Sequence, residues 1–148
     1  MTGSTRAIGR GIARALARNG ARVVVHGRQD ADVQRVANEI AGDGGTAYGV
    51  AGDLADVATL DALVTTATSR GGSLDILVNN GAVTDTFGPF LDVTDARVDE
   101  ILAVNLRGTI LLSLRAARVM AKRPSRNRSH LLAVRRRRSP LSAAMRDL

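Results

Sequence analysis

The sequence opens with TGSTRAIGR at residues 2–10 and continues as GIARALARNGARVVVHGR at residues 11–28. Glycines stand at Gly3 and Gly9 with the small Ala7 between them, and apolar residues then recur at helical spacing until Gly20. The continuous β-branched run at 22–26 is typical of a strand that is buried on both faces. Small residues before a helix let an anion approach its free N–H groups, so this stretch predicts a phosphate-binding loop.

The same alternation of strand and helix continues along the chain. Helices are expected over about 8–19, from residue 30 to the GDGG at 42–45, over 56–69 and over 95–122, and strands over 22–26, 46–54 and 74–80. Such alternation indicates βαβ units and an α/β fold with a doubly wound, Rossmann-type parallel sheet. Only Met1 precedes the loop where a first strand would stand, so the sheet is expected to be incomplete, without its first strand and without strands after the fourth.

Charge divides the chain into two parts. Residues 1–122 carry no net charge, whereas residues 123–148 hold eight arginines against Asp147 and account for the whole net charge of +7. The sequence has no cysteine, 45% apolar residues and no apolar run long enough to span a membrane. We therefore expect a cytoplasmic protein with no membrane association and no metal site.

The last 26 residues, 123–148, show no sustained period of either kind. Three readings remain open: a disordered basic tail, a contact with RNA or another acidic surface, and a reading-frame shift near residue 123. Arginine runs favour phosphate contacts, but the tail has no aromatic residue to stack on bases, so a nucleic-acid partner is not expected. The frame-shift hypothesis rests on His130-Leu131-Leu132, whose codons can encode Ile-Ser-Ser one base later. The flanking DNA would test it.

Five motifs in order resemble the short-chain dehydrogenase/reductase family over residues 2–122. They are T-G-x-x-x-A-x-G at 2–9, GR at 27–28, Asp53-Leu54, NNGA at 79–82 and VNLRG at 104–108. Ala7 stands where the family usually has glycine, and NNGA exchanges the last two residues of the family's NNAG. The resemblance implies a partial dinucleotide-binding domain over 1–122 that takes NADP(H) in preference to NAD(H), because a guanidinium at 28 suits a 2′-phosphate. The cofactor-binding residues it implies are Gly3, Ser4, Thr5, Arg6, Ile8, Gly9, Arg28, Asp53, Leu54, Asn79 and Gly81.

The resemblance also implies hydride transfer between the cofactor and a small carbonyl or alcohol substrate, with Asn105 anchoring a proton-relay water. The family's catalytic Tyr-x-x-x-Lys is missing, because the only tyrosine is Tyr48 and the only lysine is Lys122. The family's catalytic serine has no counterpart either. We therefore expect an oxidoreductase fragment that is inactive as written. The alternative is a non-catalytic nucleotide-binding or RNA-associated protein that uses its arginine-rich tail.

Two further expectations concern assembly and stability. Intact relatives are homo-oligomers through helices that include residues 95–121, and whether this shorter chain assembles is left open. Without a first strand and a strand after the fourth, LDILV at 74–78 would lose both neighbours. It would then pair directly with RVVVH at 22–26 or stay exposed as a sheet edge. Marginal stability is expected.

Overall fold

The computed structural model describes residues 1–83, 89–122 and 130–133. Strands and helices alternate as the apolar periodicity predicts, which confirms the α/β class. The elements are α1 (Ala7–Arg18), β1 (Arg22–Gly27), α2 (Asp30–Gly42), β2 (Thr46–Ala51), α3 (Val57–Ser69), β3 (Ile76–Asn79), η1 (Phe90–Asp92), α4 (Asp95–Leu102), η2 (Ala103–Gly108), α5 (Thr109–Met120) and β4 (His130–Ala133). The helical stretch predicted over 95–122 consists of α4, the π-helical segment η2 and α5.

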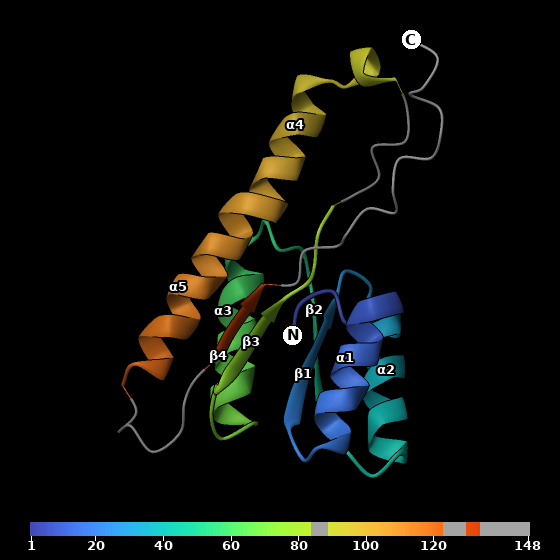
Figure 1. Cartoon of the computed structure of the whole chain (residues 1–148), viewed down its shortest axis with the longest axis vertical. Coiled ribbons are helices and arrows are strands. Elements are labelled where there is room, and N and C mark those ends of the chain that lie inside the picture. Colours follow the sequence, from blue (N-terminus) through green and yellow to red (C-terminus); the bar gives the residue numbers. More distant parts are fainter. Residues whose placement is uncertain (84–88, 123–129, 134–148) are drawn as a thin grey trace, which may run out of the picture.

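The strands form two parallel ladders, β1 with β2 and β3 with β4. In the first ladder Arg22 lies opposite Thr46 and Gly27 opposite Ala51. Helices cover both faces of the strands: α1 and α2 pack on one side, and α3 and α5 lie on the other (Figure 1). This arrangement is the three-layer plan of a doubly wound fold.

The core consists of two apolar clusters, one on each face of the strands, and β1 contributes side chains to both. Val24 packs into the cluster on the α3 and α5 side, whereas Val23 and Val25 pack into the cluster on the α1 and α2 side. Successive side chains of a strand point to opposite faces. A continuous β-branched run is therefore what a strand covered on both faces requires.

The expectation that the strand at 74–80 lacks both neighbours is wrong. It does not pair with β1. It pairs instead with β4, in a register that runs from Ile76 opposite His130 to Asn79 opposite Ala133. The expected absence of any strand after this one is corrected with it. Periodicity could not reveal β4, because four residues are too few to establish a pattern and the pairing is non-local. The expectations of a disordered tail or a shifted frame cover residues 123–148. Of these only 130–133 are described, and they form β4; residues 123–129 and 134–148 lie outside the described residues.

The first residues of the chain run between the two ladders. The Met1 amino group donates to the Val24 carbonyl at 2.8 Å, and the Thr2 N–H donates to the Val78 carbonyl at 3.0 Å. The Ser4 N–H then donates to the His26 carbonyl at 2.8 Å. Residues 1–4 thus hydrogen-bond to both β1 and β3, and they join the two ladders near the carboxyl ends of their strands.

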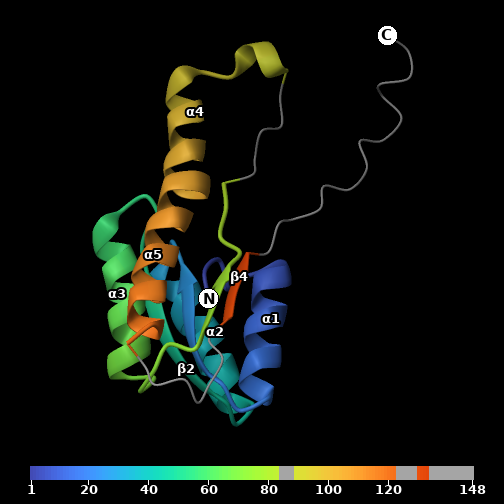
Figure 2. The same ribbon diagram turned by 60° about the vertical axis from the view of Figure 1, so that its left-hand side comes forward.

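The continuous helix of α4, η2 and α5 extends beyond the rest of the molecule (Figure 2). Large apolar side chains stand at every fourth position along it and are about half exposed: Val98, Leu102, Leu106, Ile110 and Leu114. Among the described residues, no helix has both the length and the apolar character needed to cross a membrane.

Candidate functional site

A cavity of about 470 Å³ lies at the carboxyl ends of β1 and β3. Parallel α/β sheets bind ligands at this edge, where the loops after several strands meet. The lining comes from the loop before α1, the ends of β1 and β3, and the first part of the long helix: Gly3, Thr5, Arg6, His26, Gly27, Arg28, Gln29, Asp32, Asp53, Leu54, Asn80, Gly81, Ala82, Val83, Arg97, Glu100 and Val104.

Glycines let the loop before α1 lie directly against the chain after β3. Gly3 has a φ of +59°, and a Cβ there would lie 2.7 Å from the Gly81 Cα. A Cβ at Gly9 would lie 2.0 Å from the Gly3 carbonyl oxygen, and one at Gly81 would lie 2.8 Å from Cδ1 of Leu54. Such separations exclude side chains, so the main chain itself forms the floor of the cavity.

The amino end of α1 faces this floor without a capping side chain. Arg6 is the N-cap residue, and its side chain makes no capping hydrogen bond. Ala7 follows with a φ of 45°, the one positive φ of a non-glycine residue in the part of the chain that the structure describes. Uncapped N–H groups and the positive end of a helix dipole favour an anion at this point.

His26 connects the glycine loop to the ends of both β1 and β2. Its Nδ1 accepts a hydrogen bond from the Gly3 N–H at 3.2 Å, which places the ring proton on Nε2, where it can donate to the Gly52 carbonyl at 3.2 Å. Burial, and to a lesser extent the nearby Met1 amino terminus, lower the pKa of His26 to about 4. The imidazole is therefore neutral at physiological pH, and it serves as a fixed bridge between loop and sheet.

Two exposed arginines, Arg6 and Arg28, line the cavity. Neither forms an ion pair with another of the residues that the structure describes. Arg10 lies in the first turn of α1, close to the same loop, but its Nε donates a hydrogen bond to the Glu39 carboxylate at 2.9 Å. The guanidinium groups of Arg6 and Arg28 are therefore the cations available to an anionic ligand.

Polar groups of other loops complete the lining. Oδ1 of Asp53 accepts from the Ala55 N–H at 2.8 Å, so this exposed carboxylate both shapes its turn and faces the cavity. Asn80 is 4% exposed, and its Nδ2 donates to the carbonyls of Thr2 and Gly3. The Asn80 Oδ1 is buried with no hydrogen-bond partner among the described residues. A ligand that carries donor groups would satisfy this acceptor.

The structure brings together seven of the residues that the resemblance implies, namely Gly3, Thr5, Arg6, Arg28, Asp53, Leu54 and Gly81. Of the other implied cofactor residues, Ser4 is fully buried and bonds to Met1 and His26. Asn79 donates from Nδ2 to Oγ of Ser113 at 3.0 Å. Ile8 is about half exposed on the first turn of α1, and Gly9 packs against the Gly3 carbonyl. None of these four residues lines the cavity: Ser4, Ile8 and Gly9 belong to the loop and the start of α1, and Asn79 connects β3 to α5.

Asn105, expected to anchor a water, lies in η2 and holds the chain that follows β3. Its Oδ1 accepts from the Val83 N–H at 2.8 Å, and its Nδ2 donates to the Val83 carbonyl at 2.8 Å. A side-chain amide that bonds both the main-chain N–H and the carbonyl of one residue holds the backbone of that residue in place. Asn105 thus positions Val83, which is a wall of the cavity.

Sequence reasoning missed His26 and Asn80, which lie at the centre of the site. A polar residue at the end of each buried strand was the available signal, because strand ends meet at the ligand edge of a parallel sheet. Tyr48 lies elsewhere, on β2, with the Arg70 guanidinium 4.6 Å from the centre of its ring. No group of three or more His, Asp or Glu side chains suited to a metal occurs among the residues described.

Comparisons with known proteins point to one family. The family model for short chain dehydrogenases matches residues 1–128. A dehydrogenase/reductase SDR family member 4 from Bos taurus is 39% identical over 123 residues, which cover 83% of this chain and 44% of the relative. A sorbitol dehydrogenase from Cereibacter sphaeroides is 38% identical over 120 residues, 81% of this chain and 45% of the relative. The chain thus spans about half the length of the curated relatives it matches.

Solved structures similar to this chain include short-chain dehydrogenases and oxidoreductases as well. A metagenomic short-chain oxidoreductase in complex with NADP has a TM-score of 0.78 at 36% identity, covering 89% of this chain and 58% of that one. A short chain dehydrogenase from Burkholderia cenocepacia in complex with NADP has a TM-score of 0.74 at 36% identity, covering 80% and 49% of the two chains.

Proposed function

Because this chain belongs to the short-chain dehydrogenase/reductase family, we propose that it binds a nicotinamide dinucleotide in the cavity at the ends of β1 and β3, and that it prefers NADP(H) to NAD(H). The observation that carries the proposal is the juxtaposition of an uncapped helix end, a glycine floor and Arg6 and Arg28 around one cavity. When bound, the cofactor supplies or accepts a hydride.

The residues present fit such a cofactor. The N–H groups at the start of α1 would hold the pyrophosphate, since Gly3 and Gly9 leave the main chain open to close approach. Arg28 and Arg6 would hold the 2′-phosphate, which a guanidinium can bind through two hydrogen bonds. The buried Asn80 Oδ1 and the Asp53 carboxylate would accept hydrogen bonds from ribose hydroxyls or the adenine amine.

Calorimetric titration with NADPH and with NADH tests the proposal. NADPH is expected to bind at least about tenfold more tightly, and Arg28→Ala should remove most of that difference, because a charge-assisted hydrogen bond contributes about 1.5–3 kcal/mol. The matched control is Arg118→Ala, which removes an exposed arginine near the end of α5. If the Arg28→Ala variant has the same affinities for NADPH and NADH as the Arg118→Ala variant, the assignment of Arg28 fails.

The proposal extends to the reaction of the intact family, the interconversion of a carbonyl and an alcohol by hydride transfer, with this chain supplying cofactor binding but no turnover. General acid–base catalysis needs a positioned proton donor, and Tyr48 lies on β2 and does not line the cavity. Purified chain should oxidise no NADPH in the presence of ketones above the level of an Arg28→Ala preparation. Turnover that Arg28→Ala abolishes would overturn this part.

We also propose that the exposed stripe on α4, η2 and α5 is a surface for self-association. Five large apolar side chains at every fourth position form a row on one helical face. Replacing Leu106 and Ile110 by lysine should lower the sedimentation coefficient at a concentration where the unmodified chain associates. A control pair, Arg118→Lys with Ala117→Lys, should not change it.

A further inference from the structure

The cavity proposed to hold the cofactor (the cofactor cavity) has a wall with as many acidic as basic side chains. Three carboxylates and three guanidinium groups line it: Asp32, Asp53, Glu100, Arg6, Arg28 and Arg97. These six groups together carry no net charge. A preference for a 2′-phosphate therefore depends on what holds each carboxylate, because a carboxylate left free beside Arg28 would compete with the phosphate for that guanidinium.

Each of the three carboxylates has a partner in the structure. Asp53 accepts a hydrogen bond from a main-chain N–H of its own turn. Glu100 accepts from Arg97, which stands three residues earlier on α4. Asp32 accepts from Nη2 of Arg35 at 2.9 Å, three residues later on α2. Arg35 differs from Arg97 in one respect, because Arg35 does not line the cavity itself.

Asp32 is the carboxylate best placed to interfere with Arg28. It lies four residues after Arg28, in the first turn of α2. Both side chains are exposed, and both line the cofactor cavity. Two opposite charges on one wall attract each other, and a pair between them would occupy the guanidinium that the 2′-phosphate needs. In the structure Asp32 pairs with Arg35 instead.

A network of four charges holds Arg35 in this position. Its Nη1 donates to Glu39 at 3.1 Å, one turn further along α2. Glu39 also accepts from Nε of Arg10 at 2.9 Å, and Arg10 belongs to α1, on the same side of the sheet as α2 (Figure 1). The Glu39 side chain is 29% exposed and that of Asp32 is 53% exposed, so the network is anchored at Glu39. Hydrogen bonds to Asp32 and then to Glu39 raise the pKa of Arg35 above its ordinary value, so its charge is permanent.

The neighbouring acidic residue on α2 has a different partner. Asp30 also stands in the first turn of α2, but it does not line the cavity. Its Oδ1 accepts from Nε2 of Gln34 at 3.2 Å, and Gln34 is neutral. Of these two aspartates, only the one on the cavity wall is paired with an arginine. Asp30 therefore offers a matched comparison for Asp32.

On the basis of the NADP(H) site proposed above, we propose that Arg35 is a specificity-determining residue of that site. By holding Asp32 along α2, Arg35 keeps this carboxylate from competing with the 2′-phosphate for Arg28. NADH carries a hydroxyl in place of the phosphate, so its binding does not need a free Arg28. Arg35 thus acts on the preference between the two nucleotides, and it acts through Asp32 as a positioning residue outside the cavity.

Calorimetric titration of the full chain with NADPH and with NADH tests this role. Arg35→Gln removes the charge, keeps a long polar side chain and frees Asp32. It should weaken NADPH binding about two- to fivefold, the range of one exposed ion pair, and change the affinity for NADH less than about 1.5-fold. Asp32→Asn removes the competing carboxylate. The double variant, Asp32→Asn with Arg35→Gln, should therefore bind NADPH as tightly as Asp32→Asn alone.

Two controls make the same changes of charge elsewhere. Arg115→Gln breaks the ion pair between Arg115 of α5 and Asp61 of α3, neither of which lines the cofactor cavity. Asp30→Asn removes a carboxylate from the same turn of α2 as Asp32, outside the cavity. Both variants should keep the ratio of the two nucleotide affinities of the unmodified chain.

Three results would overturn the role of Arg35. The first is an Arg35→Gln variant with an unchanged preference for NADPH. The second is equal weakening of both nucleotides, which would indicate that Arg35 only supports α2. The third is a loss of NADPH affinity that persists in the Asp32→Asn background, which would indicate a direct effect of the Arg35 charge. An unmodified chain without any preference for NADPH would overturn the proposed cofactor preference itself, and the role of Arg35 with it.

Discussion

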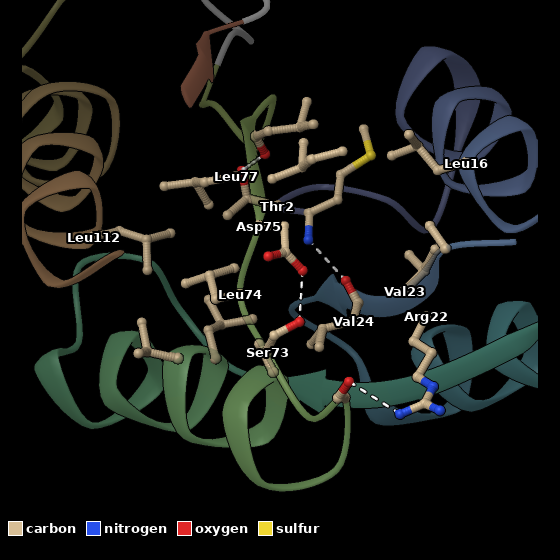
Figure 3. Close-up of a pocket in the computed structure, with 18 of the residues that line it drawn as sticks. Thr2, Leu16, Arg22, Val23, Val24, Ser73, Leu74, Asp75, Leu77 and Leu112 are labelled. Carbon is tan, nitrogen blue, oxygen red and sulfur yellow. Dashed lines mark hydrogen bonds between the residues drawn. The ribbon is translucent and has the colours of Figure 1, made fainter. Parts of the chain in front are cut away.

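Two cavities of similar size, about 470 and 360 Å³, lie on either side of residues 1–4, and they are lined by opposite kinds of groups. The cofactor cavity has main-chain N–H groups at a helix end, two arginines and the buried polar atoms of Asn80. The smaller cavity lies between β1 and β3 and is lined by residues of both strands and by leucines (Figure 3). The first is complementary to an anion, and the second is lined mainly by apolar side chains.

The comparison shows that the contacts that shape the ligand edge are separate from those along the middle of the strands. Close glycine contacts and a hydrogen bond to His26 hold the loop before α1 against β1 and β3. The strand residues in these contacts lie near the strand ends. Farther from these strand ends, a cavity of about 360 Å³ lies between β1 and β3. The following predictions test the contacts of the ligand edge.

The largest effect is expected from Gly9→Ala. The new Cβ would lie 2.0 Å from the Gly3 carbonyl oxygen, so the loop must move away from α1. We expect a loss of about 3 kcal/mol in the free energy of unfolding, or an unfolded chain, together with loss of NADPH binding. Urea denaturation and calorimetry measure the two effects.

Gly11→Ala is the matched control, since a Cβ at Gly11 meets nothing within 4 Å. Alanine there should stabilise α1 by about 0.5–1 kcal/mol. It can also serve as a background in which Gly9→Ala remains folded. Equal effects of the two substitutions would show that the loop does not depend on the close approach of Gly9.

These contrasts also show what could be predicted from sequence. Local signals were sufficient for β1 and α1, because apolar spacing and glycine content specify them directly. Arg28 and Asp53 were expected at the cavity only through the resemblance of ordered motifs to a family, and both line it. Local signals were not sufficient for β4, because its four residues form a strand only by pairing with β3. Asn105 could be identified as important, but its contact with Val83 depends on tertiary packing that spacing does not encode.

A second prediction concerns pH, because a buried histidine, His26, lines the cofactor cavity. Its pKa is lowered to about 4 in the folded chain, against about 6.5 in an unfolded one. Between these values the unfolded chain binds a proton that the folded chain does not, so stability falls as the pH drops from about 6.5 to 4. The loss is at most about 3 kcal/mol and does not grow further below pH 4.

Urea denaturation between pH 7.5 and 4.5 measures this slope. His26→Gln cannot take up the proton, so its stability should fall less steeply over that range than that of the unmodified chain. The remaining slope reports other groups, including the Met1 amino group, whose pKa is lowered to about 5. Parallel profiles for the two proteins would show that His26 is not the source of the slope.

The smallest effect is expected from Ala7→Gly, at the start of α1. Ala7 adopts a φ of 45°, a conformation that costs a residue with a Cβ about 1 kcal/mol and costs glycine little. Glycine should therefore raise the free energy of unfolding by less than about 1 kcal/mol, because its greater freedom in the unfolded chain offsets part of the gain. It should also tighten NADPH binding slightly by relaxing the floor of the cofactor cavity. Urea denaturation of the two proteins and titration with NADPH measure these changes. Unchanged stability and unchanged NADPH affinity would show that the backbone conformation of Ala7 carries no strain.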